Sequence, residues 1–410
     1  MSNSPYPLFS VLGIEIEYML VDRDTLMVQP KSDELLAHFA DGHITTNVDL
    51  GDIAISNELV MHVLELKNNG PRPPHAPIDL HFQQAINQLQ PVLQSLNLCL
   101  LPTAAHPWMN PRTEAKRWPH GNQAMYKQYD TIFNCNGHGW SNLQSMHVNL
   151  PFANDEEFNI LHNTVRLLLP LLPALAASSP LLEGAPTQVL DSRLNFYEKN
   201  QQKIPSIAGN IIPEFIQTKA EYQHRILTPM YRDIAPFDPD HLLQKELLNS
   251  RAAIPKFDVG ALEIRIIDTQ ECVNADIAIA HVIHALLNDW CTKNCAPTAP
   301  NIDLRALKAL YDQIIKTGFT TTLDNTEILS AWQLPKRTMT VRDAWSFLIE
   351  RVSTYLTKNE QQSLEHTLRH GNLSERILRA CHMDYTRPTL HRVYSELAHC
   401  LLTNQVFTPS

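Results

Sequence analysis

The 410-residue chain is long enough to bury a large core, and its 44% hydrophobic and 19% charged residues are typical of globular proteins. A formal net charge of -10, without any lysine and arginine cluster, argues against nucleic acid or an anionic membrane as a partner. The longest apolar run, Leu167–Ala177, is too short for a bilayer, and no signal peptide is recognisable. The scattered cysteines lack disulfide-framework spacing, so we expect a cytoplasmic protein.

A strongly apolar strand is predicted at residues 11–21, VLGIEIEYMLV. Ile14, Ile16 and Tyr18 fall on one face of this strand, whereas Glu15 and Glu17 fall on the other. The two carboxylates would be about 6 to 7 Å apart along the backbone, a spacing that suits one shared metal ion or two neighbouring ions. An ordinary solvated strand face is the alternative explanation.

A short helix is predicted at Ser32–Phe39, followed by a second strand region at Ile53–Asn69 that contains Glu58 and Glu65. On a straight strand these two carboxylates would face opposite ways. Glu58 can therefore reach the same site only from before the strand or across a bulge, and it is otherwise an ordinary surface residue. Glu65 interrupts an apolar run, where an unpaired buried carboxylate would be costly.

Two further strands carry polar residues on alternate positions. Ser145–Pro151 has His147 and Asn149 on one face, and Ala261–Asp268 has Glu263 and Arg265 on one face. Residues 108–143, which lie ahead of the first of these strands, have the composition of irregular functional loops.

The remaining elements are mostly helical. We predict a helix after the proline-rich residues 70–77, a buried strand at Leu98–Ala105, apolar helices at Asp155–Ala177 and Asp276–Trp290, and long loops with short helices over 183–260. Asn294–Asp303 has the composition of a linker, and only helical periodicities follow it. We therefore expect a catalytic domain at residues 1–293 and an all-helical subdomain at residues 294–410.

Together the four strands offer one polar face, which consists of Glu15, Glu17, Glu65, His147, Asn149, Glu263 and Arg265. A solvated face would normally be rich in lysine, threonine and glutamine, and these positions include no lysine. Four clustered carboxylates repel one another unless cations lie between them. We infer a divalent-metal site on an antiparallel sheet, where carboxylate ligands favour Mg2+ and one imidazole keeps Mn2+ acceptable.

Several motifs occur in the order and approximate spacing of a known family. GIEIEY, the Glu58-x6-Glu65 pair, AAHPW, QSMHVNLP, LAASSP with LDSR, and ALEIRIID resemble the carboxylate-amine ligases of glutamate-cysteine ligase family 2, within the glutamine synthetase superfamily. The resemblance covers roughly residues 10–290. It implies an α+β fold in which a curved, mainly antiparallel sheet cups the active site, with outer helices and a C-terminal helical subdomain.

The resemblance also implies roles for individual residues. The implied metal ligands are Glu15, Glu17, Glu58, Glu65, His147 and Glu263. Arg265 and Arg193 would neutralise the phosphates of ATP and the transferred phosphoryl group. These two arginines and Glu65 are the implied catalytic residues. Arg117 is a candidate partner for a substrate carboxylate, and Asn149 a further substrate-binding residue.

The implied activity is ATP-dependent amide formation through an acyl phosphate, with Mg2+ as the metal. The implied substrates are glutamate as the acid and a small amine as the acceptor. The resemblance also makes a homo-oligomer reasonable. The chain departs from the family pattern HVHVG, because Asn149 and Pro151 replace its second histidine and its glycine. A weakened protein that only binds Mg-ATP, or another metal-dependent phosphotransferase of the superfamily, therefore remains an alternative.

Overall fold

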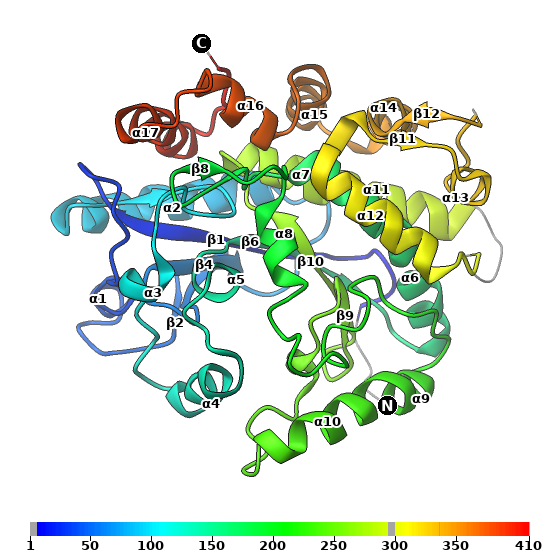
Figure 1. Ribbon diagram of the computed structural model, residues 1–410, viewed down its shortest axis with the longest axis horizontal. Coiled ribbons are helices and arrows are strands. Elements are labelled where there is room, and N and C mark those ends of the chain that lie inside the picture. Colours follow the sequence, from blue (N-terminus) through cyan, green and yellow to red (C-terminus); the bar gives the residue numbers. More distant parts are fainter. Residues whose placement is uncertain (1–5, 294–299, 336, 410) are drawn as a thin grey trace.

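The computed structural model describes residues 6–293, 300–335 and 337–409. Its centre is one eight-stranded antiparallel sheet in the order β2-β3-β4-β1-β6-β10-β9, and β5 pairs with the end of β1 beyond β6 (Figure 1). The strands are β1 (Gly13–Asp22), β2 (Asn47–Asp49), β3 (Ile53–Asn57), β4 (Val63–Asn68), β5 (Leu98–Leu101), β6 (Ser145–Pro151), β9 (Ala253–Lys256) and β10 (Ala261–Asp268). This architecture confirms the predicted fold class.

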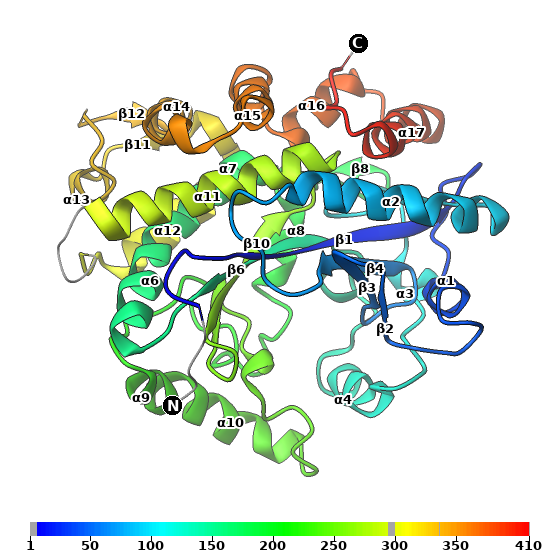
Figure 2. The ribbon, with the colours of Figure 1, turned by 180° about the vertical axis from the view of Figure 1, so that it is seen from behind.

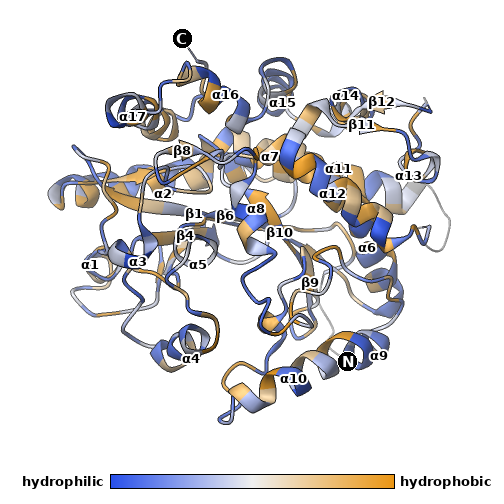
Figure 3. Cartoon of the chain, in the orientation of Figure 1, coloured by the Kyte–Doolittle hydropathy of each residue, from blue (hydrophilic) through white to orange (hydrophobic). Residues whose placement is uncertain are grey.

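The alternation of β1 separates an apolar face from a polar face. Ile14, Ile16 and Tyr18 have no exposed surface. Helices α2 (Ile78–Ser95) and α11 (Val273–Lys293) run across the sheet beside each other and cover this apolar face (Figure 2). Both α11 and β1 are coloured largely as hydrophobic in Figure 3. The polar face, which carries the predicted site residues, lies on the opposite side of β1 from these helices.

The second strand region is two strands rather than one. β3 and β4 pair with each other, and residues 58–62 connect them. Helix α1 (Ser32–His38) lies where it was predicted. The prediction of one continuous helix over 155–177 was wrong in detail, because a 3-10 turn at Leu169–Leu171 separates α6 (Asp155–Leu168) from α7 (Leu172–Ala176). Pro170 lies at the start of the 3-10 turn and Pro173 at the start of α7, where a missing amide proton costs least.

Residues 108–143 are more helical than their composition suggested. They form α3 (Pro111–Glu114), α4 (Gln123–Phe133) and α5 (His138–Ser141). The prediction of irregular loops was therefore wrong for α4, which has an amphipathic sequence but begins without a side-chain cap.

The region 183–260 has the predicted mixture of loops and short helices. The elements from residue 181 on are β7 (Leu181–Leu182), β8 (Ala185–Pro186), α8 (Ser192–Tyr197), α9 (Lys219–Tyr222), a π turn at Gln223–Leu227, α10 (Thr228–Ile234), and 3-10 turns at Ala235–Phe237 and Glu246–Leu248. Strand β9, at the edge of the sheet, was not predicted.

The C-terminal region is mainly helical, but not wholly so. Its elements are α12 (Leu304–Thr317), a 3-10 turn at Gly318–Thr320, β11 (Thr322–Leu323), α13 (Thr326–Ala331), β12 (Met339–Thr340), α14 (Val341–Val352), a 3-10 turn at Ser353–Tyr355, α15 (Lys358–His370), α16 (Leu373–Ala380) and α17 (Arg387–Thr403). The two-residue strands β11 and β12 correct the all-helical prediction. Residues 294–299 of the predicted linker lie outside the described residues.

The C-terminal helices share buried contacts with the rest of the chain. The indole nitrogens of Trp332 and Trp345 donate to the carbonyls of Leu167 and Leu171. Such long-range pairing of buried donors holds this region against the helices that follow β6. None of the helices within the described residues is long and apolar enough to cross a membrane.

Candidate active site

Four neighbouring strands bring the predicted polar residues to one face of the sheet. Opposite one another across the ladders lie Glu17 and Glu65, Glu15 and His147, and Asn149 and Glu263. Antiparallel partners have Cβ atoms about 5 Å apart, so these pairs are in side-chain contact range. Arg265 lies where β10 shifts register against β6, and its backbone amide donates to Ala252 instead. The predicted alternation therefore places seven polar residues side by side.

These residues form two compact clusters of possible metal ligands. The Glu15 cluster consists of Glu15, His147 and Glu263, and the Glu17 cluster consists of Glu17, Glu58 and Glu65. Within each cluster, one ligand atom from every residue lies within 4.8 Å of the others. Glu58 joins its cluster from the connection between β3 and β4, which is the position before the strand that the prediction required.

The Glu15 cluster is held by a chain of hydrogen bonds. The imidazole Nδ1 of His147 is 3.1 Å from Glu15 Oε2, and Asn149 donates to Glu15 Oε1 at 3.2 Å. Burial opposes ionisation of Glu15, but His147 and the charges of Lys256 and Lys67 outweigh it and lower its pKa to about 2. Glu15 is therefore a carboxylate at every physiological pH.

The Glu17 cluster is acidic and more strongly desolvated. Glu17 Oε2 accepts from the backbone amide of Ser145 at 2.7 Å and from its hydroxyl at 3.1 Å, and Glu65 Oε1 accepts from Ser56 at 2.8 Å. Burial raises the pKa of Glu17 and, together with repulsion by Glu65 and Glu17, raises that of Glu58 well above its usual value. A cation between the three carboxylates would relieve this repulsion.

Both donor sets fit the proposed metals. Three carboxylates match the oxygen preference of Mg2+ and Mn2+, and two carboxylates with one imidazole suit Mn2+ and remain compatible with Mg2+. The fit rests on the donor chemistry of the two clusters and on the raised pKa of Glu17 and Glu58, which burial and then repulsion between the carboxylates cause and which a bound cation would relieve.

Two arginines flank the clusters. Arg265 Nε is 3.1 Å from Glu263 Oε1, and one of its terminal nitrogens donates to the carbonyl of Asn249. Arg193, on α8, is buried in an ion pair of 2.5 Å with Asp268. Its Nη2 is buried without a hydrogen-bond partner, and its charge lowers the pKa of Glu17. Arg193 thus has an unused donor and lies close enough to Glu17 to influence its charge.

Arg117 is a predicted site residue that pairs with a carboxylate outside the two clusters. Its guanidinium pairs with Asp130 of α4 at 3.2 Å. The same helix contributes Tyr126, whose hydroxyl accepts from Asn57 next to Glu58. Helix α4 therefore borders the Glu17 cluster, although Arg117 itself contacts Asp130.

Two functional candidates were missed from the sequence: Lys67 of β4 and Lys256 of β9. Lys67 Nζ is 2.8 Å from Glu65 Oε1, and Lys256 forms an ion pair with Glu263. Lys67 follows Glu65 at the next position on the same face of β4, so strand alternation alone could have identified it. Lys256 was missed because β9 was not predicted.

A cavity of about 340 Å3 opens beside the Glu15 cluster. Glu15, Asn149, Lys67 and Lys256 contribute to its lining, together with apolar groups such as those of Val11, Ile14, Pro71, Pro151 and Val259. An apolar hollow next to charged groups is the usual shape of a site for a mixed polar and apolar ligand.

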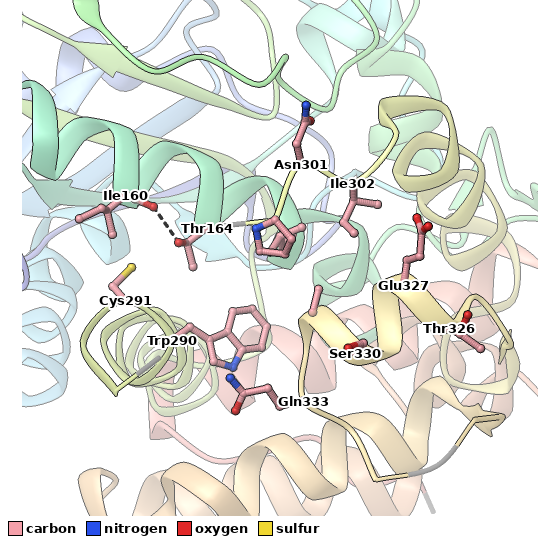
Figure 4. Close-up of a pocket in the computed structure, with 13 residues that line it drawn as sticks. Ile160, Thr164, Trp290, Cys291, Asn301, Ile302, Thr326, Glu327, Ser330 and Gln333 are labelled. Carbon is pink, nitrogen blue, oxygen red and sulfur yellow. Dashed lines mark hydrogen bonds between the residues drawn. The ribbon is translucent and has the colours of Figure 1, made fainter. Parts of the chain in front are cut away.

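A larger cavity, of about 640 Å3, lies elsewhere (Figure 4). Trp290 and Cys291 of α11 face Thr164 of α6 and residues of α13 across it. None of the carboxylates of the two clusters lines this cavity within the described residues, and we assign no chemistry to it.

Two proteins share sequence similarity with this chain over about two thirds of its length. The chain is 35% identical over 277 residues to an uncharacterized protein of Archaeoglobus fulgidus. The aligned residues cover 68% of this chain and 74% of that relative. The chain is 22% identical over 284 residues to a protein of Gloeobacter violaceus provisionally named glutamate-cysteine ligase 2, which covers 67% of each chain.

A solved structure supports the fold. The crystal structure of glutamate-cysteine ligase from Francisella tularensis in complex with AMP superposes with a TM-score of 0.65 at 14% identity and covers 95% of this chain and 88% of that one. The model of glutamate-cysteine ligase family 2 matches residues 11–396. This chain therefore belongs to glutamate-cysteine ligase family 2, a family of carboxylate-amine ligases.

Proposed function

We propose that this protein is an ATP-dependent carboxylate-amine ligase that activates glutamate as an acyl phosphate and transfers the γ-glutamyl group to a small amine. The observation that carries the proposal is the pair of adjacent ligand clusters, flanked by Arg265 and Arg193, on the polar face of the sheet. Phosphoryl transfer needs this kind of site, because catalysis consists mainly of positioning and charge neutralisation.

In this proposal, the Glu15 and Glu17 clusters would hold divalent cations, which would neutralise charge on the phosphates. A substrate carboxylate oxygen bonds to the γ-phosphorus of ATP while the bond to the β-phosphate oxygen breaks and ADP leaves. The amine nitrogen then bonds to the acyl carbon, phosphate leaves, and the amine loses a proton. Arg265 and the free Nη2 of Arg193 would donate to the transferred group in both steps.

The cavity beside Glu15 is suited to the apolar part of the nucleotide. Its mixture of aliphatic and proline surface with polar groups at one end would receive a base while the phosphates extend along the ligand clusters. The AMP complex of the Francisella tularensis enzyme supports a nucleotide in this fold. We further propose that Arg117 or Asn149 binds a substrate carboxylate or amide.

The first test is phosphate release from purified protein with ATP and Mg2+, with and without L-glutamate, across a panel of amines that includes cysteine. Release that requires both glutamate and one amine would support the ligase and identify its acceptor. Release without an amine would indicate a phosphotransferase. Binding of Mg-ATP without release under any combination of acid and amine would overturn the proposed reaction and support a binding protein.

A further inference from the structure

Two lysines hold positions in the site that cations would otherwise take. Lys67 Nζ is 2.8 Å from both Glu65 Oε1 and Ser56 Oγ. Lys256 pairs with Glu263 and lies 3.8 Å from Glu15 Oε1. In each ligand cluster, therefore, one carboxylate forms an ion pair with a lysine: Glu65 with Lys67 and Glu263 with Lys256.

Both lysines also border the cavity beside Glu15, and they approach it from different strands. Lys67 belongs to β4 on one side of β1, and Lys256 belongs to β9 on the other side. Their side chains are 32% and 21% exposed, so neither is locked into the core. A flexible four-carbon stem with three rotatable donors can turn from one anion to another within a few ångströms.

The charges favour such a turn when metal and nucleotide are present. Each ammonium group neutralises a carboxylate that a divalent cation would also bind, and the divalent ion has the greater charge at a similar distance. A lysine displaced in this way loses its anion. The phosphate chain of a nucleotide whose base occupies the cavity would provide a new one nearby.

We propose that Lys67 and Lys256 exchange partners, from the ligand carboxylates in the metal-free protein to phosphate oxygens of the bound nucleotide. The inference rests on the proposed function and adds two nucleotide-binding residues to it. The lysines then act in two ways. They compete with divalent cations before the nucleotide binds, and they attract the nucleotide afterwards.

The opposite signs of these two effects provide the test. We would titrate Lys67→Met and Lys256→Met by calorimetry, first with Mn2+ alone and then with ATP at saturating Mn2+. Without nucleotide, Mn2+ should bind each variant about threefold more tightly, because a competing ammonium group has been removed. ATP should bind about tenfold more weakly, because a charge-assisted hydrogen bond is lost, whereas adenosine should bind as it does to the wild type.

Lys245→Met is the matched control, since Lys245 is an exposed lysine of the segment that precedes β9. It should alter neither titration. Lys256→Arg keeps the charge and should retain most of the ATP affinity. Melting temperatures would identify variants that have lost their fold.

Two results would overturn the inference while leaving the proposed function in place: unchanged ATP affinity in both methionine variants, or weaker binding of Mn2+ and adenosine together with ATP, as expected for lysines that only support the fold. Wild-type protein that binds Mn2+ but not ATP would instead overturn the proposed function, and the exchange of partners with it.

Discussion

The Glu15 cluster and the Glu17 cluster share a strand, yet their charges are balanced in different ways. Around Glu15 the chain supplies an imidazole, an amide and the ammonium group of Lys256, and the pKa of Glu15 falls to about 2. Around Glu17 three carboxylates converge in a desolvated place, and the pKa values of Glu17 and Glu58 rise. The same two-residue spacing on β1 therefore produces opposite electrostatic environments.

This difference indicates how each cluster depends on an added cation. The Glu15 cluster is already compensated by groups of the chain, so a metal must displace Lys256 from Glu263 to bind there. In the Glu17 cluster Lys67 pairs with Glu65 and the charge of Arg193 lowers the pKa of Glu17, yet burial still raises the pKa of Glu17, so a metal brings the larger gain in stability. We expect the Glu17 cluster to be the more sensitive of the two to mutation, pH and metal removal.

The largest effect should come from Glu17→Gln. Losing one of three carboxylates removes both charge and a ligand, so phosphate release should fall by about 10²-fold or more. Ser145 can still donate to the amide oxygen of the glutamine, so the melting temperature of the metal-free protein should not fall. Activity assays and thermal denaturation check both expectations.

Glu34→Gln is the control, because Glu34 is an exposed glutamate of α1 and should be neutral in both measurements. Near-normal phosphate release from Glu17→Gln would remove Glu17 from the mechanism. It would also show that phosphate release depends more on the Glu15 cluster than on the Glu17 cluster.

The pH dependence of metal binding should be the next largest effect. Because the pKa of Glu58 is raised, part of the protein is protonated there at pH values above 4.5, where a glutamate is ordinarily ionised. A metal ion must displace that proton, so Mn2+ affinity should fall by up to about tenfold for each pH unit on acidification in this range. Calorimetry on Glu15→Gln, which leaves the Glu17 cluster intact, isolates the effect.

The matched variant for the pH series is Glu58→Gln, whose amide has no proton to lose. Its Mn2+ affinity should be lower but should change less with pH. An equally steep profile in this variant would assign the proton to another group.

The strand pattern could be predicted because alternation fixes which side chains share a face. Glu15, Glu17, His147 and Glu263 lie where the period of two places them, since the apolar alternate positions of each strand must face the helices. Glu58 could not be placed with certainty, because its position depends on the connection between β3 and β4 rather than on any periodicity.

Alternation on β4 could also have placed Lys67 beside Glu65, but other parts of the site could not be derived from local patterns. Pro255 interrupts the four residues of β9, so this edge strand and its Lys256 lack the usual strand composition. Helix α4 lies among glycine, asparagine and histidine residues and begins without a side-chain cap. The buried pair of Arg193 and Asp268 depends on tertiary packing between α8 and the end of β10.

A smaller effect is expected on the stability of the metal-free protein. A folded-state pKa above the unfolded value means that ionised Glu58 destabilises the fold at neutral pH, and that this penalty disappears as Glu58 is protonated on acidification. Glu58→Gln should therefore stabilise the protein at pH 7.5, because the glutamine has no charge to desolvate. Glu15 has the opposite sign, because its stabilising effect is present above pH 4.5 and is lost as the pH falls toward its pKa of about 2.

Chemical denaturation in the presence of a chelator would measure both variants. Glu15→Gln should be less stable than the wild type at pH 7.5, and Glu58→Gln more stable. Destabilisation of both variants by the same amount would show that the two clusters are electrostatically alike.

The smallest effect should come from Asn149→His, which restores the second histidine of the family pattern. Asn149 already contacts Glu15, and it lies opposite Gly13, which has no side chain to crowd a larger ring. If position 149 reaches the cation, a second imidazole should raise Mn2+ affinity by about threefold. Measuring it in the Glu17→Gln background restricts the signal to the Glu15 cluster. Unchanged Mn2+ affinity in that background, together with a raised KM for glutamate when Asn149→His is the single substitution, would instead assign Asn149 to the substrate.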